Sequence, residues 1–382
     1  MSGTPRRRIL IPFLGTSVGG SHVSAITLAE ALRAAGHDPV IGLHETGDVL
    51  AEWLTARGMP FIALPRVEMP AEARSIARQV PMLVRTVPPL RRYLRQGRFD
   101  LVHSQDLRMH RLWTVPARTA GIAHVWHQRT PTRSRRAVGF ARFATEIVAV
   151  SAFCREALPD AMRARASVVL DPVAETALPD GDAIRARLLA LSGATPDRPV
   201  IGFAANLAPR KRADVFVAAA ERLLAGDGPR PVFAILGEER EPDAAALRAR
   251  IADAGLGGDV ALIGPQRPLE PWLAAFDILA APARREAFGR VLVEAMLAGT
   301  PVVAADEGGH REILRHGETG LLVPPDDPDA LARAMRGLLQ DPERSAALAR
   351  AGRADARARF SVDAHLREME AVFDRACRAR RL

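Results

Sequence analysis

The sequence predicts an α/β protein built from parallel sheets covered by helices. Short apolar runs typical of buried strands alternate with helical segments along the chain, and this alternation is the pattern that parallel sheets produce. The alternation occurs in two successive series, and 382 residues are enough for about two domains. A hydrophobic content of 48% supplies a buried core for each domain.

The first series begins with a buried strand and a glycine-rich turn. The turn Gly15–Ser21 leads into a helix expected from about His22 to Ala35, which Gly36 ends. The expected strands of this series are Ile9–Leu14, Val40–Leu43, Phe61–Leu64, Leu101–His103, His124–Trp126 and Ile147–Val150.

The second series begins at Val200, after an interdomain linker expected near 170–182. Its expected strands are Val200–Ala204, Val232–Leu236, Val260–Ile263, Ile278–Ala281, Val302–Ala304 and Leu321–Val323. The tail 361–380 has an apolar stripe at helical spacing, which indicates a terminal helix that packs against other parts of the chain. We expect domains at 1–175 and 176–358, and a helix at 359–382 that crosses back to the first domain.

Composition narrows the class of protein. No apolar run reaches 18 residues, so no transmembrane helix is expected, and Ile9–Leu14 is too short for a signal peptide. The two cysteines, Cys154 and Cys377, cannot frame a disulfide scaffold and lack metal-ligand spacing. These features favour a cytoplasmic protein.

The excess of positive over negative charge is confined to the first half of the chain. Residues 1–180 hold 24 basic and 15 acidic residues, whereas 181–382 hold 29 of each. One expected cluster lies on a helix, with Arg91, Arg95 and Arg98 on one face beside Arg92. A second expected cluster lies in a loop and comprises Arg129, Arg133, Arg135, Arg136 and Arg142. Such patches fit an acidic acceptor or the inner face of an anionic membrane, and equally the solvated face of an arginine-rich protein.

Nucleic acid is not an expected partner. Aromatic residues make up 5% of the chain, and no recognition module is present.

Two glutamates, Glu286 and Glu294, bracket the most informative segment. A strand precedes Glu286, and Phe288-Gly289 opens a helix that ends near Gly299 and contains Glu294. Eight residues on one helix would span about 12 Å of axis and place the carboxylates roughly 80° apart. That is too far for the carboxylate pair of a retaining glycosidase, which needs about 5–5.5 Å.

The helix start between the glutamates offers backbone N–H groups to a phosphate. Carboxylates beside a phosphate are useful when they accept hydrogen bonds from sugar hydroxyls. The segment therefore fits a sugar diphosphate, with one glutamate for each sugar ring. Taken singly, each glutamate is also what an ordinary helix start or a solvated helix face would show.

Lys211 is the single lysine in a chain with 53 basic residues. It follows the expected strand Val200–Ala204, and open α/β sheets bind ligands at the carboxyl ends of their strands. A compact ammonium on a flexible stem suits a diphosphate. The alternative is a lysine retained by chance at a helix start.

The segment from about Val200 to Pro325 resembles the family 4 glycosyltransferases, which have the GT-B fold, and the resemblance extends over most of the chain. The motifs that carry it are the Glu286-x7-Glu294 segment with Phe288-Gly289 and Glu294-Ala295-Met296, Gly299-Thr300-Pro301-Val302-Val303, Gly308-Gly309, and Gly317-Glu318-Thr319-Gly320-Leu321-Leu322-Val323. The resemblance implies two Rossmann-like domains facing across a cleft, with the donor mostly on the second.

The resemblance also implies roles for these residues. Glu286 would hold donor-sugar hydroxyls, Glu294 the ribose, and Lys211 the diphosphate, while the Gly19-Gly20 loop would approach the phosphates and the acceptor. The expected catalytic residues are Lys211, Glu286, His127 and Arg129. The expected substrate-binding residues are Gly19, Gly20, His103, Asn206, Arg210, Phe288, Gly289, Arg290, Val291 and Glu294.

The chain departs from the family pattern at two places. Asn206 stands where the family usually has arginine, and Arg210 can supply the missing charge. The paired histidine of the family appears as His103 with Gln105, and a later active-site histidine aligns with Arg129 while His127 lies nearby. The sequence allows either His127 or Arg129 to face the donor.

The sequence thus predicts a glycosyltransferase that moves a sugar from a nucleotide diphosphate sugar to an acceptor hydroxyl, and the resemblance implies retention of anomeric configuration. An anionic glycolipid of the cell envelope or a polysaccharide is a fitting acceptor. No cofactor or metal is expected, because fixed cations already stand at the diphosphate. The alternatives are a GT-B sugar-nucleotide isomerase and a non-catalytic nucleotide-sugar binder.

Overall fold

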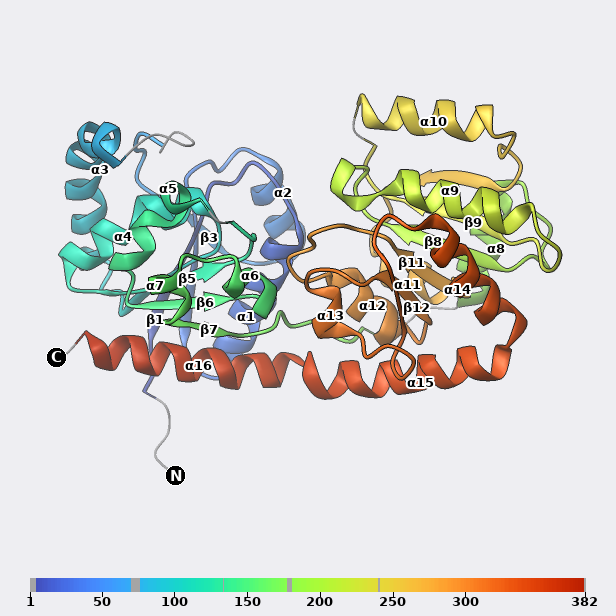
Figure 1. The fold of residues 1–382 in the computed structure, drawn as a ribbon. Coiled ribbons are helices and arrows are strands. Elements are labelled where there is room, and N and C mark those ends of the chain that lie inside the picture. Colours follow the sequence, from blue (N-terminus) through green and yellow to red (C-terminus); the bar gives the residue numbers. More distant parts are fainter. Residues whose placement is uncertain (1–4, 70–75, 133, 177–180, 240, 381–382) are drawn as a thin grey trace. The chain divides into compact units, whose positions relative to one another are not determined.

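The computed structural model describes residues 5–69, 76–132, 134–176, 181–239 and 241–380, and the chain divides into two compact units (Figure 1). The first domain comprises Met1–Pro172 and Val362–Leu382, and the second comprises Val173–Ser361. Each contains a parallel sheet with helices on it, which confirms the predicted α/β class.

The first-domain sheet has the strand order β3-β2-β1-β4-β5-β6-β7 in the described chain. Its strands are β1 Arg8–Phe13, β2 Asp38–Leu43, β3 Phe61–Ala63, β4 Leu101–Ser104, β5 Ala123–Gln128, β6 Glu146–Ala149 and β7 Ala166–Val168. The six expected strands are confirmed. The sequence prediction omitted β7.

Helices of the first domain connect these strands. They are α1 Gly20–Ala34, α2 Val49–Ala56, α3 Ile76–Gln96, α4 Leu107–Ala120, α5 Arg135–Val138, the 3₁₀ helix η1 Gly139–Phe143, α6 Ala152–Glu156 and α7 Asp160–Arg163. The strand order reverses between β1 and β4, so the ligand crevice of this sheet is expected at their carboxyl ends. The turn before α1 and the residues after β4 lie there.

The first expected arginine cluster is partly wrong. Because α3 ends at Gln96, Arg98 lies beyond the helix, with φ of 51°, and does not share a helix face with Arg91 and Arg95. Those two arginines donate from Nε to the carbonyl oxygens of Thr119 at 3.1 Å and of Ala120 at 3.4 Å. They therefore join the end of α3 to the end of α4.

The second expected arginine cluster is not a single loop. Arg135 begins α5 and Arg142 lies in η1, whereas Arg133 lies outside the described residues. Arg129 is separate from them, because its side chain is buried in an ion pair with Asp171.

The second-domain sheet has the order β10-β9-β8-β11-β12-β13 in the described chain. Its strands are β8 Val200–Ala204, β9 Val232–Leu236, β10 Val260–Gly264, β11 Ile278–Ala281, β12 Val302–Ala305 and β13 Leu321–Val323, as the sequence predicts. Its helices are α8 Gly181–Ser192, the 3₁₀ helix η2 Pro209–Lys211, α9 Ala213–Leu224, α10 Asp243–Asp253, α11 Glu270–Ala274, α12 Arg290–Ala298, α13 His310–Ile313, α14 Pro328–Gln340 and α15 Pro342–Arg359.

The topology of this sheet fixes the position of the site. The strand order reverses between β8 and β11, which are paired neighbours. Lys211 follows β8, and Glu286 and α12 follow β11. Parallel neighbouring strands end at the same edge of the sheet, so Lys211 and Glu286 meet although 74 residues separate them along the chain.

The terminal helix α16, Val362–Ala379, belongs to the first domain, as predicted. Its buried face contributes Met369, Val372, Phe373 and Ala376 to the same hydrophobic core as β1 and α1. Asp374 forms an ion pair with Arg7, and Glu370 lies 3.0 Å from His37 Nε2. The helix is therefore held by apolar burial on one face and by polar contacts at its edges.

Within the described chain, no helix combines the length and the apolar character needed to cross a membrane.

Replacing Phe373 by Ala should lower the free energy of unfolding by about 3–5 kcal/mol, because the ring is fully buried and leaves a cavity. Urea denaturation followed by fluorescence measures the change. Arg378→Ala, at an exposed position of the same helix, is the control. An equally stable Phe373→Ala protein would contradict the assignment of α16 to this core.

Candidate functional site

A pocket lies at the carboxyl edge of the second-domain sheet. Its walls come from β8, η2, β11, the start of α12 and the start of α13. The lining residues are Phe203, Ala204, Ala205, Lys211, Leu279, Ala280, Ala281, Ala283, Glu286, Gly289, Val291 and His310. One cavity is therefore lined by four of the predicted site residues, namely Lys211, Glu286, Gly289 and Val291.

Two cations share one carboxylate oxygen in this site. Lys211 Nζ and Arg210 Nη1 each lie 2.6 Å from Glu286 Oε2. Burial raises the pKa of Glu286, but the charges of Lys211 and then Arg210 outweigh it and lower that pKa to about 2. Glu286 is therefore ionised at neutral pH, and this group of three side chains carries one excess positive charge. An anionic ligand would complete its charge balance.

The start of α12 faces the same pocket. Gly289 has φ of 108°, a left-handed conformation that favours glycine, and a β-carbon there would lie 2.9 Å from His310 Cδ2. In the described chain, no side chain caps this helix start. Its first-turn N–H groups and its positive dipole end add to the attraction for an anion.

Glu294 lies one helical turn further along α12. Its Oε1 accepts a hydrogen bond from Arg290 Nη2 at 3.0 Å, and both side chains are largely buried. Burial raises the pKa of Glu294; Arg290 acts in the opposite direction, and Glu270 raises the pKa further. The sequence did not indicate this ion pair, because its motif defines only the two glutamates.

The remaining second-domain predictions differ in their surroundings. Asn206 is exposed in the loop after β8. The ring of Phe288 is buried and packs edge-on against Phe360 at 5.7 Å between centroids, so it supports the loop from the core side.

His310 was missed by the sequence analysis. It lines the pocket, and its Nδ1 lies 3.1 Å from the carbonyl oxygen of Ala305. Burial lowers the pKa of His310, although Glu286 raises it, so the ring is neutral at physiological pH. The signal that could have found it is its place directly after Gly308-Gly309, at the carboxyl end of β12.

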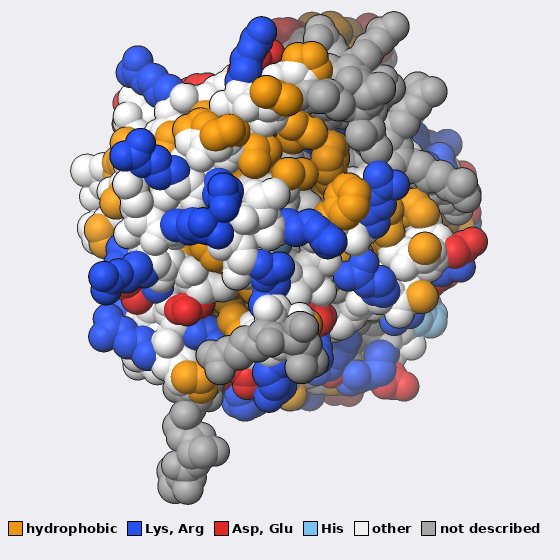
Figure 2. All heavy atoms as spheres, turned by 90° about the vertical axis from the view of Figure 1, so that its left-hand side faces the viewer, with side chains coloured by type: hydrophobic (Ala, Val, Ile, Leu, Met, Phe, Trp, Pro, Cys, Tyr) orange, Lys and Arg blue, Asp and Glu red, His pale blue; other side chains and the backbone are white. Residues whose placement is uncertain are grey.

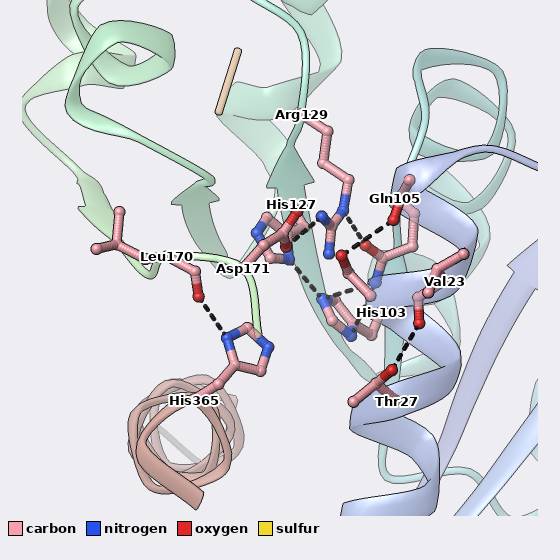
Figure 3. Close-up of polar contacts among 11 residues, drawn as sticks. Val23, Thr27, His103, Gln105, His127, Arg129, Leu170, Asp171 and His365 are labelled. Atoms are coloured by element: carbon pink, nitrogen blue, oxygen red, sulfur yellow. Dashed lines mark hydrogen bonds and ion pairs between the residues drawn. The ribbon is translucent and has the colours of Figure 1, made fainter. Parts of the chain in front are cut away.

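A second polar cluster lies at the carboxyl edge of the first-domain sheet (Figure 3). His103 Nε2 lies 3.2 Å from His127 Nδ1, and Gln105 Nε2 lies 3.0 Å from His103 Nε2. Arg129 donates from Nε to Gln105 Oε1 and from Nη1 to Asp171 Oδ1, each at 2.5 Å. The predicted His103, His127 and Arg129 thus belong to one network.

The sequence left His127 and Arg129 as alternatives, and the structure shows what surrounds each of them. The His127 side chain is fully buried and stacks on His103, whereas the Arg129 guanidinium is buried in its ion pair with Asp171. Burial, and then the charge of Arg129, hold the pKa of both histidines well below their usual value. Asp171 was missed because a lone aspartate in an expected linker carries no signal.

Gly19 and Gly20 lie where α1 begins, after β1. Gly19 has extended backbone and donates from its N–H to Nδ1 of His22 at 3.1 Å. In the second domain the predicted residues Lys211, Arg210 and Glu286 meet at the pocket, and in the first domain His103, His127 and Arg129 form one network. Each group lies at the edge where its sheet is expected to bind ligands. Among the described residues, no group of His, Cys, Asp and Glu is arranged to hold a metal ion.

The family models match the two halves of the chain separately. "Glycosyltransferase Family 4" matches residues 18–173, and "Glycosyl transferases group 1" matches residues 189–355. A protein from Jonesia denitrificans named D-inositol 3-phosphate glycosyltransferase is 35% identical over 48% of this chain, but the match spans only 44% of that protein. A protein of the same name from Nocardioides is 29% identical over 87% of this chain and 82% of its own length.

Solved structures show the same fold along nearly the whole chain. The Anabaena protein HepE, in complex with UDP and glucose, has a TM-score of 0.79 at 22% identity, covering 97% of this chain and all of that one. The sucrose-phosphate synthase of Thermosynechococcus elongatus has a TM-score of 0.78 at 21% identity, covering 97% of this chain and 98% of that one.

The two parallel-sheet domains and these likenesses define a protein of the GT-B fold, as the sequence predicts. The chain belongs to the family 4 glycosyltransferases.

His103 and His127 should stay neutral from pH 5.5 to 8, because burial disfavours the imidazolium form. Ring carbon–proton NMR should show no titration of either residue in that range, with assignments from His103→Gln and His127→Gln. A His127 signal that titrates near pH 6.5, the ordinary value, would mean that the ring is open to solvent.

Proposed function

We propose that this chain transfers a glycosyl group from a nucleotide diphosphate sugar to an acceptor hydroxyl, with retention of anomeric configuration. The observation that carries the proposal is the contact of Lys211 and Arg210 with Glu286 in a pocket that the start of α12 also faces. This arrangement offers two cations and a helix dipole to a diphosphate, and a carboxylate to sugar hydroxyls.

Cleavage of the glycosidic bond leaves negative charge on the departing diphosphate. Lys211, Arg210 and the N–H groups at the start of α12 are fixed before the reaction, so they stabilise that charge without reorganising. Glu286 would accept hydrogen bonds from the donor sugar and hold both cations in place. Glu294 would accept hydrogen bonds from the ribose. In this mechanism no metal ion is needed to neutralise the diphosphate.

The acceptor is assigned to the first domain, beside Gly19 and Gly20. Relatives of this chain are named for inositol phosphate and for lipopolysaccharide core as the molecules they act on or build. These names, and the basic first half of this chain, support an anionic acceptor such as a cell-envelope glycolipid. An isomerase is not favoured, because the named relatives are glycosyltransferases.

Lys211→Ala should lower the transfer rate by roughly 100-fold or more, because it removes a preorganised charge beside the leaving group. The measurement is release of nucleoside diphosphate from a donor found by calorimetry against a panel of nucleotide sugars. Lys211→Arg keeps the charge and should retain part of the activity.

The matched control is Arg222→Ala, which removes an exposed cation of α9 that pairs with Asp329 of α14 in the same domain. It should leave the rate unchanged. Near-normal turnover by Lys211→Ala would refute the proposed role of the ammonium.

We further propose that the first domain contacts an anionic membrane surface through α3. Figure 2 shows the face that carries this helix, where arginine side chains border a band of exposed apolar side chains. The sequence of α3 contains no Asp or Glu. Its outward face is Pro81, Val84, Arg85, Pro88 and Arg92, all exposed, with Val84 68% exposed.

The opposite face of α3, with Met82, Leu90 and Leu94, packs into the first-domain core, so the outward face is fixed in orientation. A cationic face with exposed apolar groups is the pattern of helices that lie in a membrane interface. Glu68, 3.4 Å from Arg85, offsets only part of the charge.

The double variant Arg85→Glu/Arg92→Glu should bind vesicles of phosphatidylglycerol and phosphatidylcholine at least about 10-fold more weakly, since each basic residue near such a surface contributes about 1 kcal/mol. Co-sedimentation at several salt concentrations measures this binding. The control Arg344→Glu/Arg350→Glu makes the same charge change at exposed positions of α15. Equal binding by the two double variants would exclude α3 as the contact.

A further inference from the structure

Arg290 occupies an unusual place for a cation. It is the first residue of α12, where the helix dipole disfavours positive charge by about 0.3–1 kcal/mol. Its pairing with Glu294 also has the basic residue N-terminal to the acidic one, the less favourable order for an i,i+4 pair. Helix stability therefore does not explain this residue.

The surroundings of Glu294 explain it. The Glu294 side chain is 15% exposed, and Arg290 Nη2 donates to its Oε1 at 3.0 Å. Among the described residues, the charged groups that bear on Glu294 are Arg290 on its own helix and Glu270 at the start of α11, which packs against α12. Glu270 is a like charge, so Arg290 is the cation that offsets both burial and repulsion.

The two cations near the other glutamate of the motif bind a different carboxylate. Lys211 and Arg210 both bind Glu286, at the opposite end of the motif. Removing Arg290 would leave Glu294 buried beside Glu270 without a compensating charge, and a buried carboxyl in that position takes up a proton. A protonated carboxyl loses part of its capacity to accept hydrogen bonds, because one oxygen becomes a donor.

We propose that Arg290 is a positioning residue that keeps Glu294 ionised and oriented to accept hydrogen bonds from both ribose hydroxyls of the nucleotide. The inference rests on the proposed function, because it assumes that Glu294 binds the ribose. Arg290 thereby acts on nucleotide recognition through Glu294, while the diphosphate is bound by Lys211, Arg210 and the start of α12. The preference for ribonucleotides over nucleotides that lack these hydroxyls would then depend on Arg290, although this arginine need not touch the ligand.

The test compares Arg290→Gln with the unaltered protein, using UDP and GDP as probes in calorimetry from pH 5.5 to 8.5. In the variant the Glu294 pKa is raised further, so the carboxyl is protonated at the acidic end and ionises as pH rises. For the better-bound nucleotide, the dissociation constant of Arg290→Gln should be about 10-fold larger than that of the unaltered protein at pH 6. The difference should shrink toward pH 8.5. The affinity of the unaltered protein should change less with pH. Arg290→Lys should restore part of the affinity that Arg290→Gln loses at pH 6.

Two controls separate this role from a structural one and from a direct phosphate contact. Arg250→Gln removes an exposed arginine of α10 and should leave both the affinity and its pH profile unchanged. The corresponding 2′,3′-dideoxynucleoside diphosphate should bind equally weakly to the unaltered protein and to Arg290→Gln. If Arg290→Gln loses affinity equally for the ribonucleotide and for its dideoxy form, and by the same factor at every pH, the proposal is overturned.

A second readout needs no nucleotide. The side-chain carboxyl carbon of Glu294, assigned by its disappearance in Glu294→Gln, should titrate at higher pH in Arg290→Gln than in the unaltered protein. An unchanged titration overturns the proposal even if affinity falls. If the unaltered protein binds neither probe nor any nucleotide sugar, the proposed function fails, and the titration still decides whether Arg290 controls the ionisation of Glu294.

Discussion

The site depends on one shared contact, in which Glu286 Oε2 accepts hydrogen bonds from both Lys211 and Arg210 at 2.6 Å. A buried carboxylate needs its cationic partners close by. The cations follow β8 and Glu286 follows β11, and these two strands are paired neighbours whose ends lie together. The excess positive charge next to the start of α12 then makes the pocket a place for an anion. The packing of β8 against Phe276 holds this geometry, since a β-carbon on Gly202 would lie 2.0 Å from that ring.

The first domain also contains a buried ion pair at the carboxyl edge of its sheet. Arg129 and Asp171 pair with almost no solvent exposure, and Gln105 links the guanidinium to His103. The neighbouring Leu170 carbonyl accepts from His365 of α16 at 2.7 Å (Figure 3). The terminal helix thus contributes both to the core beneath the sheet and to the polar network at its edge. Leu170 and Asp171 are neighbours in the chain, so the backbone that His365 contacts also carries the carboxylate that pairs with Arg129.

Much of the fold followed from local patterns. Buried strands of a parallel sheet are continuous apolar runs, so twelve of the strands now seen, from β1 to β13 with the exception of β7, were identifiable in the sequence. The stripe of Met369, Val372 and Phe373 likewise indicated a packed terminal helix. Contacts between distant side chains carried no such signal. Arg98 was assigned to a helix face although α3 ends at Gln96, and Gly97, which follows directly, is the local stop signal that this assignment passed over.

The sequence by itself determined the α/β class, the two domains and the residue types of the donor site, because strand and helix periodicity and the Glu286-x7-Glu294 spacing are local properties of the chain. Only the tertiary structure decided which charges meet. It paired Arg290 with Glu294, buried Arg129 against Asp171 and placed His310 beside Gly289. The reason is physical: burial and opposite charge within a few ångströms set the state of an ionisable group, and both depend on the packing of segments that are far apart in sequence.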